Sequence, residues 1–168
     1  MVYESMFGDN RDVAQAIARG LEQAGVSASA VEVGVAPDVV GAEISLVVAG
    51  CPNHAWTMPR PTTRETAAKA TDEPLVSSGR GLREWLTGLR LPPKVKVVAF
   101  DTRSSAPGPV VAMDHASNAV EKRLLKLGGE RLARAQGFTV VDMKGPLADG
   151  ELDRAQAWGA TLGSDLLG

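Results

Sequence analysis

The sequence predicts an α/β fold in which a doubly wound parallel sheet carries helices on both faces. Strand-like and helix-like patterns alternate about five times along the chain, as they do in folds of this class. Two strand patterns, residues 44–49 and 95–100, are unbroken apolar runs typical of strands covered on both faces. No linker divides the 168 residues, so we expect a single domain over residues 1–168 with a shortened first strand.

The first helix has the clearest period. Val13, Ile17 and Leu21 recur four residues apart and form one apolar face, while charged side chains fall on the other face. Gly25 is the expected end of this helix, because glycine readily adopts the left-handed conformation that follows many helices.

The other elements follow from shorter patterns. Thr62 and Glu65 have the spacing of a capping box, which predicts a short helix over TRETAAKA. The expected strands, in order, are residues 1–3, 30–35, 44–49, 95–100 and 139–141. The other expected helices are residues 83–89, 119–127 and 130–135, and a last helix with Leu152, Ala155, Trp158 and Leu162 on one face.

Composition excludes several functional classes. A net charge of -2 and a pI of about 5.7 argue against an electrostatic nucleic-acid binder. Cys51 is the single cysteine, so no internal disulfide is possible, and we expect a protein of a reducing compartment, the cytoplasm. The apolar runs are too short to span a bilayer, which predicts no membrane association.

Three polar loops are expected to meet at one edge of the sheet. They follow Tyr3, Gly50 and Phe100, each at the carboxyl end of a predicted strand. Doubly wound sheets bind ligands at that edge, where the strand order reverses. The sequence therefore predicts a ligand site formed by these loops.

The first loop, from Ser5 to Asn10, leads into the first helix. Free backbone N–H groups and the helix dipole favour an anion there, and Gly8 allows the backbone to approach it closely. The alternative is an ordinary helix cap by Asp9 or Asn10, which is about as common a use of such residues. The loop is neither a three-glycine dinucleotide fingerprint nor a Walker loop.

Several stretches resemble the flavodoxin-like family. ESMFGDNR followed by VAQAIARGL is similar to its phosphate loop and first helix, in a single-domain subgroup with an E-S-M-F-G-N-T-R-type loop. VVAGCPNHAW, RPTTRE, GLREWL and KGPLADGELDRAQAWG are similar to later parts of the same subgroup. The resemblance implies a five-stranded parallel sheet in the order 2-1-3-4-5, non-covalent FMN and a role in electron transfer or as an oxidoreductase.

The resemblance also implies site residues. The phosphate would lie on Ser5, Met6, Phe7, Gly8, Asp9 and Asn10. The isoalloxazine ring would lie between the loop containing Pro52, Asn53, His54, Ala55 and Trp56 and the loop containing Asp101, Thr102 and Arg103. Asp9-Asn10 stands where the family pattern has Asn-Thr.

The residues themselves permit two interpretations in each ring-side loop. Trp56 offers a flat face for stacking on a flavin, or it is a hydrophobic lid over the sheet edge. Asn53 and His54 are expected to bond the ring edge, although His54 alone is more often a surface or capping residue. Arg103 either stabilises negative charge on the reduced ring or is simply solvated, with Asp101 beginning the turn.

Two functions compete. The first is a small FMN-binding redox protein that serves a redox partner protein or a small-molecule electron acceptor, with partner choice assigned to the Pro-rich residues 53–81. The second is a binding or regulatory module of the same fold that has weakened or lost FMN, which Asp9 favours. A hydrolase or transferase is a weaker third option, because no nucleophile–base pair supports it. Neither a catalytic residue nor a metal site is predicted.

Overall fold

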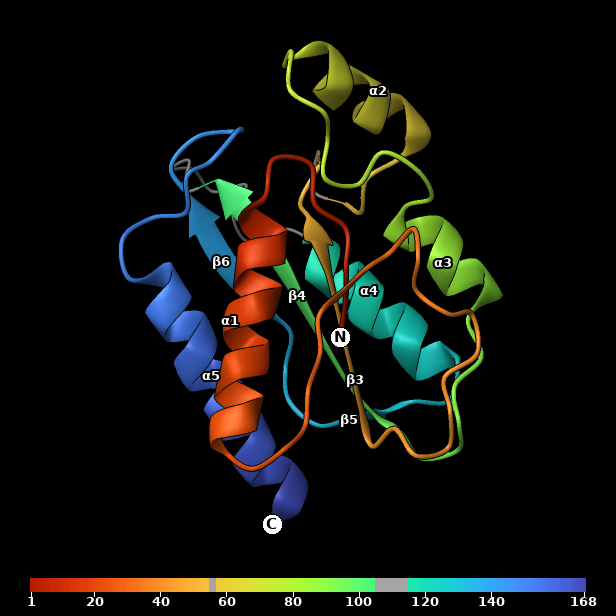
Figure 1. The fold of residues 1–168 in the computed structure, drawn as a ribbon. Coiled ribbons are helices and arrows are strands. Elements are labelled where there is room, and N and C mark those ends of the chain that lie inside the picture. The colour runs from red at the N-terminus through yellow and green to blue at the C-terminus, as the bar shows by residue number, and fades with distance from the viewer. Residues whose placement is uncertain (55–56, 105–114) are drawn as a thin grey trace.

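The computed structural model of the chain, which describes residues 1–54, 57–104 and 115–168, contains one parallel sheet between two layers of helices (Figure 1). The strands are β1 (Val2–Tyr3), β2 (Val31–Glu32), β3 (Leu46–Pro52), β4 (Lys96–Ser104), β5 (Glu130–Arg131) and β6 (Gln136–Val140). The helices are α1 (Asp9–Gln23), α2 (Pro61–Lys69), α3 (Leu82–Gly88), α4 (Ala116–Lys126) and α5 (Glu151–Leu167).

The strand order is β2-β1-β3-β4-β5, which confirms the predicted order. The sixth strand, β6, also pairs with β4. Val97 of β4 pairs with Arg131 of β5, whereas Phe100 pairs with Gln136 of β6, so β5 and β6 follow one another along the same edge of β4. Together they occupy the place of the expected fifth strand.

The prediction of a helix over residues 130–135 is wrong. The N–H groups of Glu130 and Leu132 donate to the carbonyl oxygens of Val95 and Val97, at 2.9 and 3.2 Å, which aligns this segment with β4. Gly128 adopts a φ of 94° after α4 and turns the chain back toward the sheet. Pairing with a buried strand thus overrides the helical pattern of the sequence.

Side chains alternate between the two faces of the sheet. Val48 and Val98 face α1 and α5, while Val47 and Val97 face α3 and α4. Trp85 of α3 is fully buried in the second of these cores. The two apolar runs therefore form a core on each side, as their sequence predicted.

Helices α1 and α5 lie against each other on one face (Figure 1). Gly20 and Gly159 are at their closest approach: a Cβ on Gly20 would lie 2.0 Å from the carbonyl oxygen of Gln156, and one on Gly159 would lie 2.2 Å from that of Ile17. Only glycine permits this contact between two helix backbones.

Helix α2 lies beyond the carboxyl ends of β3 and β4 (Figure 1). The short helix predicted here is confirmed, but the residues that cap its first turn differ from the prediction. The Thr63 hydroxyl accepts a 2.9 Å hydrogen bond from the N–H of Arg60, in place of the expected capping box between Thr62 and Glu65. Within the described residues, no helix has the length and apolar character needed to cross a membrane.

Candidate functional site

A cavity of about 340 Å³ lies at the carboxyl edge of the sheet, a volume within the range of small-molecule sites. All three predicted segments contribute to it. From the predicted site, the lining residues are Ser5, Met6, Phe7, Asp9, Asn10, Pro52, Asn53, His54, Thr102 and Arg103. Gly8 and Asp101 do not line it, and Ala55 and Trp56 lie outside the described residues.

Hydrogen bonds to Ser77 and within the loop itself hold the loop before α1 in place. Ser5 donates its N–H to the Ser77 hydroxyl at 3.0 Å, and the Ser77 N–H donates to the Ser5 carbonyl at 2.8 Å. The Ser5 hydroxyl in turn accepts the N–H of Gly8 at 3.1 Å. Gly8 precedes α1 with a φ of 115°, a conformation that side chains disfavour, so glycine is required at this turn.

This loop, which lines the cavity, has backbone donors with no partner within the described residues. Met6 and Phe7 have no acceptor for their backbone N–H groups among the described residues, and the same holds for Asn10 in the first turn of α1. Unpaired amides at a helix N-terminus, with the positive end of the dipole, favour an anion. The geometry therefore provides what a phosphate group requires.

Asn10 adds an unpaired acceptor. Its side chain is 2% exposed, and its Nδ2 donates to the Thr102 hydroxyl at 2.7 Å, which ties α1 to β4. Its Oδ1 is buried without a partner among the described residues. A buried acceptor in this state is costly to the folded protein.

The carboxylate of Asp9 is directed toward the loop between β6 and α5. It lies beside Gly145, where an added Cβ would come within 2.7 Å of Oδ1, and its hydrogen bonds come from the N–H groups of Leu147 and of Asp9 itself. Burial, followed by the charge of Asp12, raises the pKa of the Asp9 carboxyl. The acid is thus held at the margin of the cavity, with its charge facing the neighbouring loop.

The second segment is partly occupied by internal contacts. Asn53 donates its N–H to the Thr102 carbonyl at 2.9 Å, and its Oδ1 accepts the N–H of Ala116 at 3.1 Å, which caps α4. His54 lines the cavity, and burial, with a smaller contribution from Arg64, lowers the pKa of its imidazole. His54 is therefore neutral at pH 7 and able both to donate and to accept.

The expectation that Asp101, Thr102 and Arg103 form a loop is wrong. They belong to β4, and their backbone pairs with β3 and with β6. The buried Asp101 carboxylate accepts the Arg103 Nε–H at 2.6 Å and the Ser117 N–H, at the start of α4, at 2.8 Å. Asp101 neither begins a turn nor faces the cavity, and the charge of Arg103 is balanced by this pair.

Sequence reasoning missed two walls of the cavity. The face of α2 toward it carries small residues at helical spacing: Thr63, Thr66, Ala67 and Ala70. Met143 and Lys144 form the wall contributed by the loop after β6, and the Lys144 amino group donates to the Ala70 carbonyl across the opening. The helical spacing of small residues in α2 could have predicted the first wall from the sequence. No sequence pattern indicates that Lys144 lies at the cavity.

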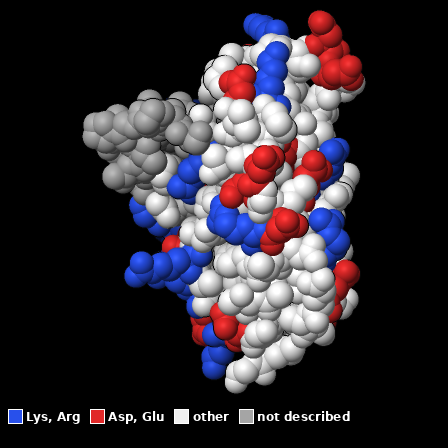
Figure 2. Space-filling model, turned by 90° about the vertical axis from the view of Figure 1, so that its left-hand side faces the viewer, with Lys and Arg blue, Asp and Glu red and all other residues white. Residues whose placement is uncertain are grey.

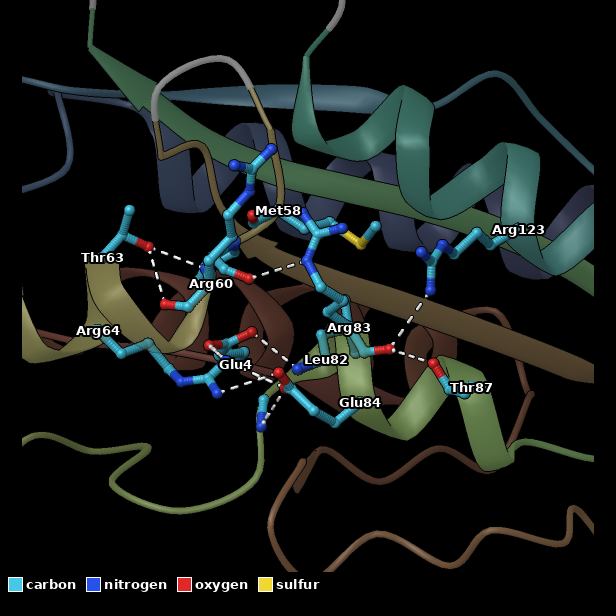
Figure 3. Close-up of polar contacts among 12 residues, drawn as sticks. Glu4, Met58, Arg60, Thr63, Arg64, Leu82, Arg83, Glu84, Thr87 and Arg123 are labelled. Atoms are coloured by element: carbon cyan, nitrogen blue, oxygen red, sulfur yellow. Dashed lines mark hydrogen bonds and ion pairs between the residues drawn. The ribbon is translucent and has the colours of Figure 1, made fainter.

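Glu4, just before the loop, links it to α3 and α2 (Figure 3). Its buried carboxylate accepts the Leu82 N–H at 2.8 Å and lies 3.5 Å from Arg64 Nη1. Arg64 also pairs with Glu84 at 3.1 Å. Burial raises the pKa of Glu4, an effect opposed by Leu82 and Arg64. This network sets the position of α2 relative to the loop before α1.

Cys51 is fully buried in β3, and burial raises the pKa of its thiol well above the ordinary value. A thiol in that state is a packing residue and not a nucleophile. Within residues 1–54, 57–104 and 115–168, no group of three or more His, Cys, Asp or Glu side chains is arranged to hold a metal ion.

Comparison with solved structures finds flavodoxins and larger flavodiiron proteins. An archaeal flavodoxin matches with a TM-score of 0.64 at 13% identity, over 99% of this chain and 96% of that chain. Oxidised flavodoxin 1 from Bacillus cereus matches with a TM-score of 0.62 at 12% identity, over 96% and 94% of the two chains. The Flv1 flavodiiron core from Synechocystis sp. PCC6803 matches with a TM-score of 0.58 at 19% identity, over 99% of this chain but 35% of that chain.

No protein-family model matches the sequence, and no curated protein matches it either. Structural similarity at identities of 12–19% shows the fold. The strand order and the helices on both faces of the sheet agree with that similarity. The chain has a flavodoxin-like fold.

Proposed function

We propose that the chain binds FMN non-covalently in this cavity and acts as a redox protein, passing electrons to a partner protein or to a small acceptor. The observation that supports this most is the set of open donors before α1: the amides of Met6, Phe7 and Asn10 share one cavity with residues 52–54 and 102–103. An anionic group joined to a flat, mostly apolar body suits such a cavity.

The residues present fit the parts of FMN. The open amides suit phosphate oxygens. The ring would lie toward Pro52 and His54, with Trp56 proposed as a stacking partner. When bound, FMN supplies the capacity to accept and donate electrons.

The chain itself would orient the ligand and set the charge around it. The α2 wall, held by Glu4 and Arg64, would cover one side of the bound ligand. Because Asp101 balances Arg103, this pair adds little net charge beside the ring. A neutral His54 adds none, so the local field would come mainly from the helix dipole, from Asp9 and from Lys144 in the cavity wall.

A titration with FMN and with riboflavin tests the proposal. Riboflavin lacks the phosphate, so FMN should bind at least ten-fold more tightly if the amides before α1 hold that group, as one charge-assisted hydrogen bond of about 1.5–3 kcal/mol implies. Flavin fluorescence quenching measures both affinities. Equal affinities would remove the phosphate assignment, and no binding of either flavin would remove the redox proposal.

A second function has one specific observation in its favour. Asp9 places an acidic side chain at the margin of the proposed phosphate loop, where its ionised form opposes an anion. If this acid prevents FMN binding, the protein is a binding or regulatory module of the same fold. The purified protein would then be colourless and would not bind added FMN. The cytoplasmic location expected from the lone cysteine, and the identity of the redox partner, belong to the same proposal.

A further inference from the structure

Helices α3 and α4 present a positively charged surface on an acidic protein. We define the α3–α4 basic surface as Arg83 together with Lys122, Arg123 and Lys126, with Arg60 at its border. Lys122 and Lys126 are exposed and one helical turn apart on α4. Since the whole chain has a net charge of -2, the positive charge is a local property of this surface.

The acids on these two helices, Glu84 and Glu121, pair with arginines outside this surface. Glu84 on α3 is bonded to Arg64, at 3.1 Å, on the side toward α2. Glu121 on α4 is mostly buried and pairs with Arg131 at 2.9 Å. In the part of the chain that the structure describes, neither Arg83 nor Arg123 pairs with a carboxylate.

Arg83 is fixed in place by uncharged oxygens. Its guanidinium donates to the Met58 carbonyl at 2.9 Å, and to the Pro59 carbonyl and the Thr57 hydroxyl at 3.3 Å (Figure 3). Burial lowers the pKa of Arg83, and the charges of Arg123 and Arg60 lower it further. These cations therefore lie close enough to repel one another, a cost that an anionic partner would relieve.

The opposite side of the molecule differs. Figure 2 shows the face on which α5 lies, where Lys and Arg side chains intermingle with Asp and Glu. Local pairs account for some of this mixing: Arg154 bonds Glu151 at 2.6 Å, and Arg11 bonds Asp12 at 2.9 Å. On this face, therefore, charges of opposite sign are interspersed.

We propose that the α3–α4 basic surface docks an acidic segment of a partner protein. Its cations come from two helices and from the residue before α2, and the cavity at the sheet edge is lined by none of them. Spread over an exposed helical surface, they suit several carboxylates of a polypeptide better than one compact phosphate.

The surface also borders the cavity. Arg83 holds residues 57–59, which follow closely on His54 in the cavity wall, and Asn53 caps the start of α4. A partner docked on α3 and α4 would therefore lie beside the cavity opening. Its role as an electron donor or acceptor rests on the proposed function, whereas its docking does not.

A decaglutamate peptide is the probe for this surface. It is titrated into the purified full chain without added FMN, at low salt, and followed by amide NMR shifts. Shifts should concentrate in residues 82–88 and 116–126, and binding should weaken strongly when salt is raised to about 0.5 M, because screening shortens the range of charge interactions. Shifts spread evenly over the chain would overturn the proposal.

Two threonines provide a matched pair of variants. Thr87 on α3 bonds the Arg83 carbonyl at 3.0 Å beside Arg123, and Thr161 on α5 bonds the Ala157 carbonyl at 3.1 Å; both are exposed. Thr87→Glu should weaken decaglutamate binding by about five-fold or more, as expected for one unfavourable charge contact in water. Thr161→Glu, of equal net charge, should change it less than two-fold. Equal effects of the two variants would overturn the proposal.

A second variant removes charge in place of adding it. The triple change Lys122→Gln, Arg123→Gln and Lys126→Gln should weaken binding more than ten-fold, and its control changes Arg19, Lys69 and Arg134 to Gln.

A titration with inorganic pyrophosphate is the last experiment. If pyrophosphate saturates the same amide shifts at lower concentration than decaglutamate, the surface is a phosphate site and the partner assignment is wrong.

Discussion

Helices α1 and α4 begin at the same edge of the sheet. Side chains of the protein accept the backbone N–H groups at the start of α4, whereas the first turn of α1 keeps an N–H group with no acceptor among the described residues. At α4, Asp101 accepts the N–H of Ser117 and Asn53 accepts that of Ala116. At α1, the amide of Asn10 has no acceptor among the described residues, and Asp9 turns toward the β6–α5 loop. One N-terminus is closed by the protein's own side chains, and the other is open.

The difference separates a structural helix end from a binding one. Both termini carry the same positive dipole, so the dipole alone identifies neither as a site. At α4 a buried carboxylate takes the place that an external anion would occupy, and Arg103 balances its charge. At α1 the carboxylate is held aside by Leu147, and the amides remain available to a ligand.

Removal of the internal anion at α4 should have the largest effect. Asp101→Ala leaves Arg103 and the N–H of Ser117 without their buried acceptor. We expect a loss of about 3 kcal/mol in the free energy of unfolding, measured by urea denaturation. Asp101→Asn, which keeps an oxygen for Ser117, should lose less. If Asp101→Ala is as stable as the wild type, the α4 terminus does not depend on this carboxylate.

Gly8→Ala, at the open N-terminus of α1, should have the second-largest effect. The φ of 115° disfavours a side chain, and the added Cβ would lie 3.2 Å from Arg11 Nη2. We expect a loss of about 1–2 kcal/mol in stability together with weaker FMN binding. Gly25→Ala is the control, because Gly25 has a φ of 86° with open space around it, far from the cavity. It should lose stability but leave FMN affinity unchanged.

The contrast explains what the sequence was able to predict. A glycine-containing loop before an amphipathic helix indicated the open terminus, and the apolar runs 44–49 and 95–100 predicted the central strands β3 and β4. The closed terminus was not predictable, because Asp101 looked like the start of a loop. It lies inside β4 because β3 and β6 both pair with that end of the strand, and these are contacts between distant segments.

The orientation of Asp9 was equally beyond local reasoning. The sequence indicated a charge conflict with a phosphate, and the structure turns the carboxylate toward Gly145 and Leu147, in a loop near the other end of the chain. The same loop supplies Lys144 to the cavity wall. A pattern within the first helix contains no information about which loop will pack against its first turn.

Asn10→Ala should affect ligand binding more than folding. In the protein alone, the Oδ1 of Asn10 has no partner among the described residues, so its loss removes no protein contact. The bond from Nδ2 to Thr102 is lost, and with it a modest part of the stability. Because Asn10 lines the cavity and ties α1 to β4, FMN affinity should fall about two- to ten-fold, the value of one hydrogen bond, by fluorescence quenching. Ser117→Ala, at the closed terminus, should leave that affinity unchanged; an equal loss in both would contradict the assignment.

Asp9→Asn should give the smallest effect, a gain in FMN affinity of about five-fold or less, since a partly hydrated charge contact is worth about 1 kcal/mol. The pH dependence makes this sharper. Burial raises the pKa of Asp9 above its ordinary value of 3.8, so the wild-type charge is lost as pH falls toward that raised value, while the variant has none to lose. The ratio of the two affinities should therefore approach one in acid, and changes in the protonation of the ligand cancel in that ratio. A gain of a thousand-fold at pH 7 would mean that the carboxylate faces the phosphate after all, and the open terminus of α1 would then be closed by its own acid as α4 is.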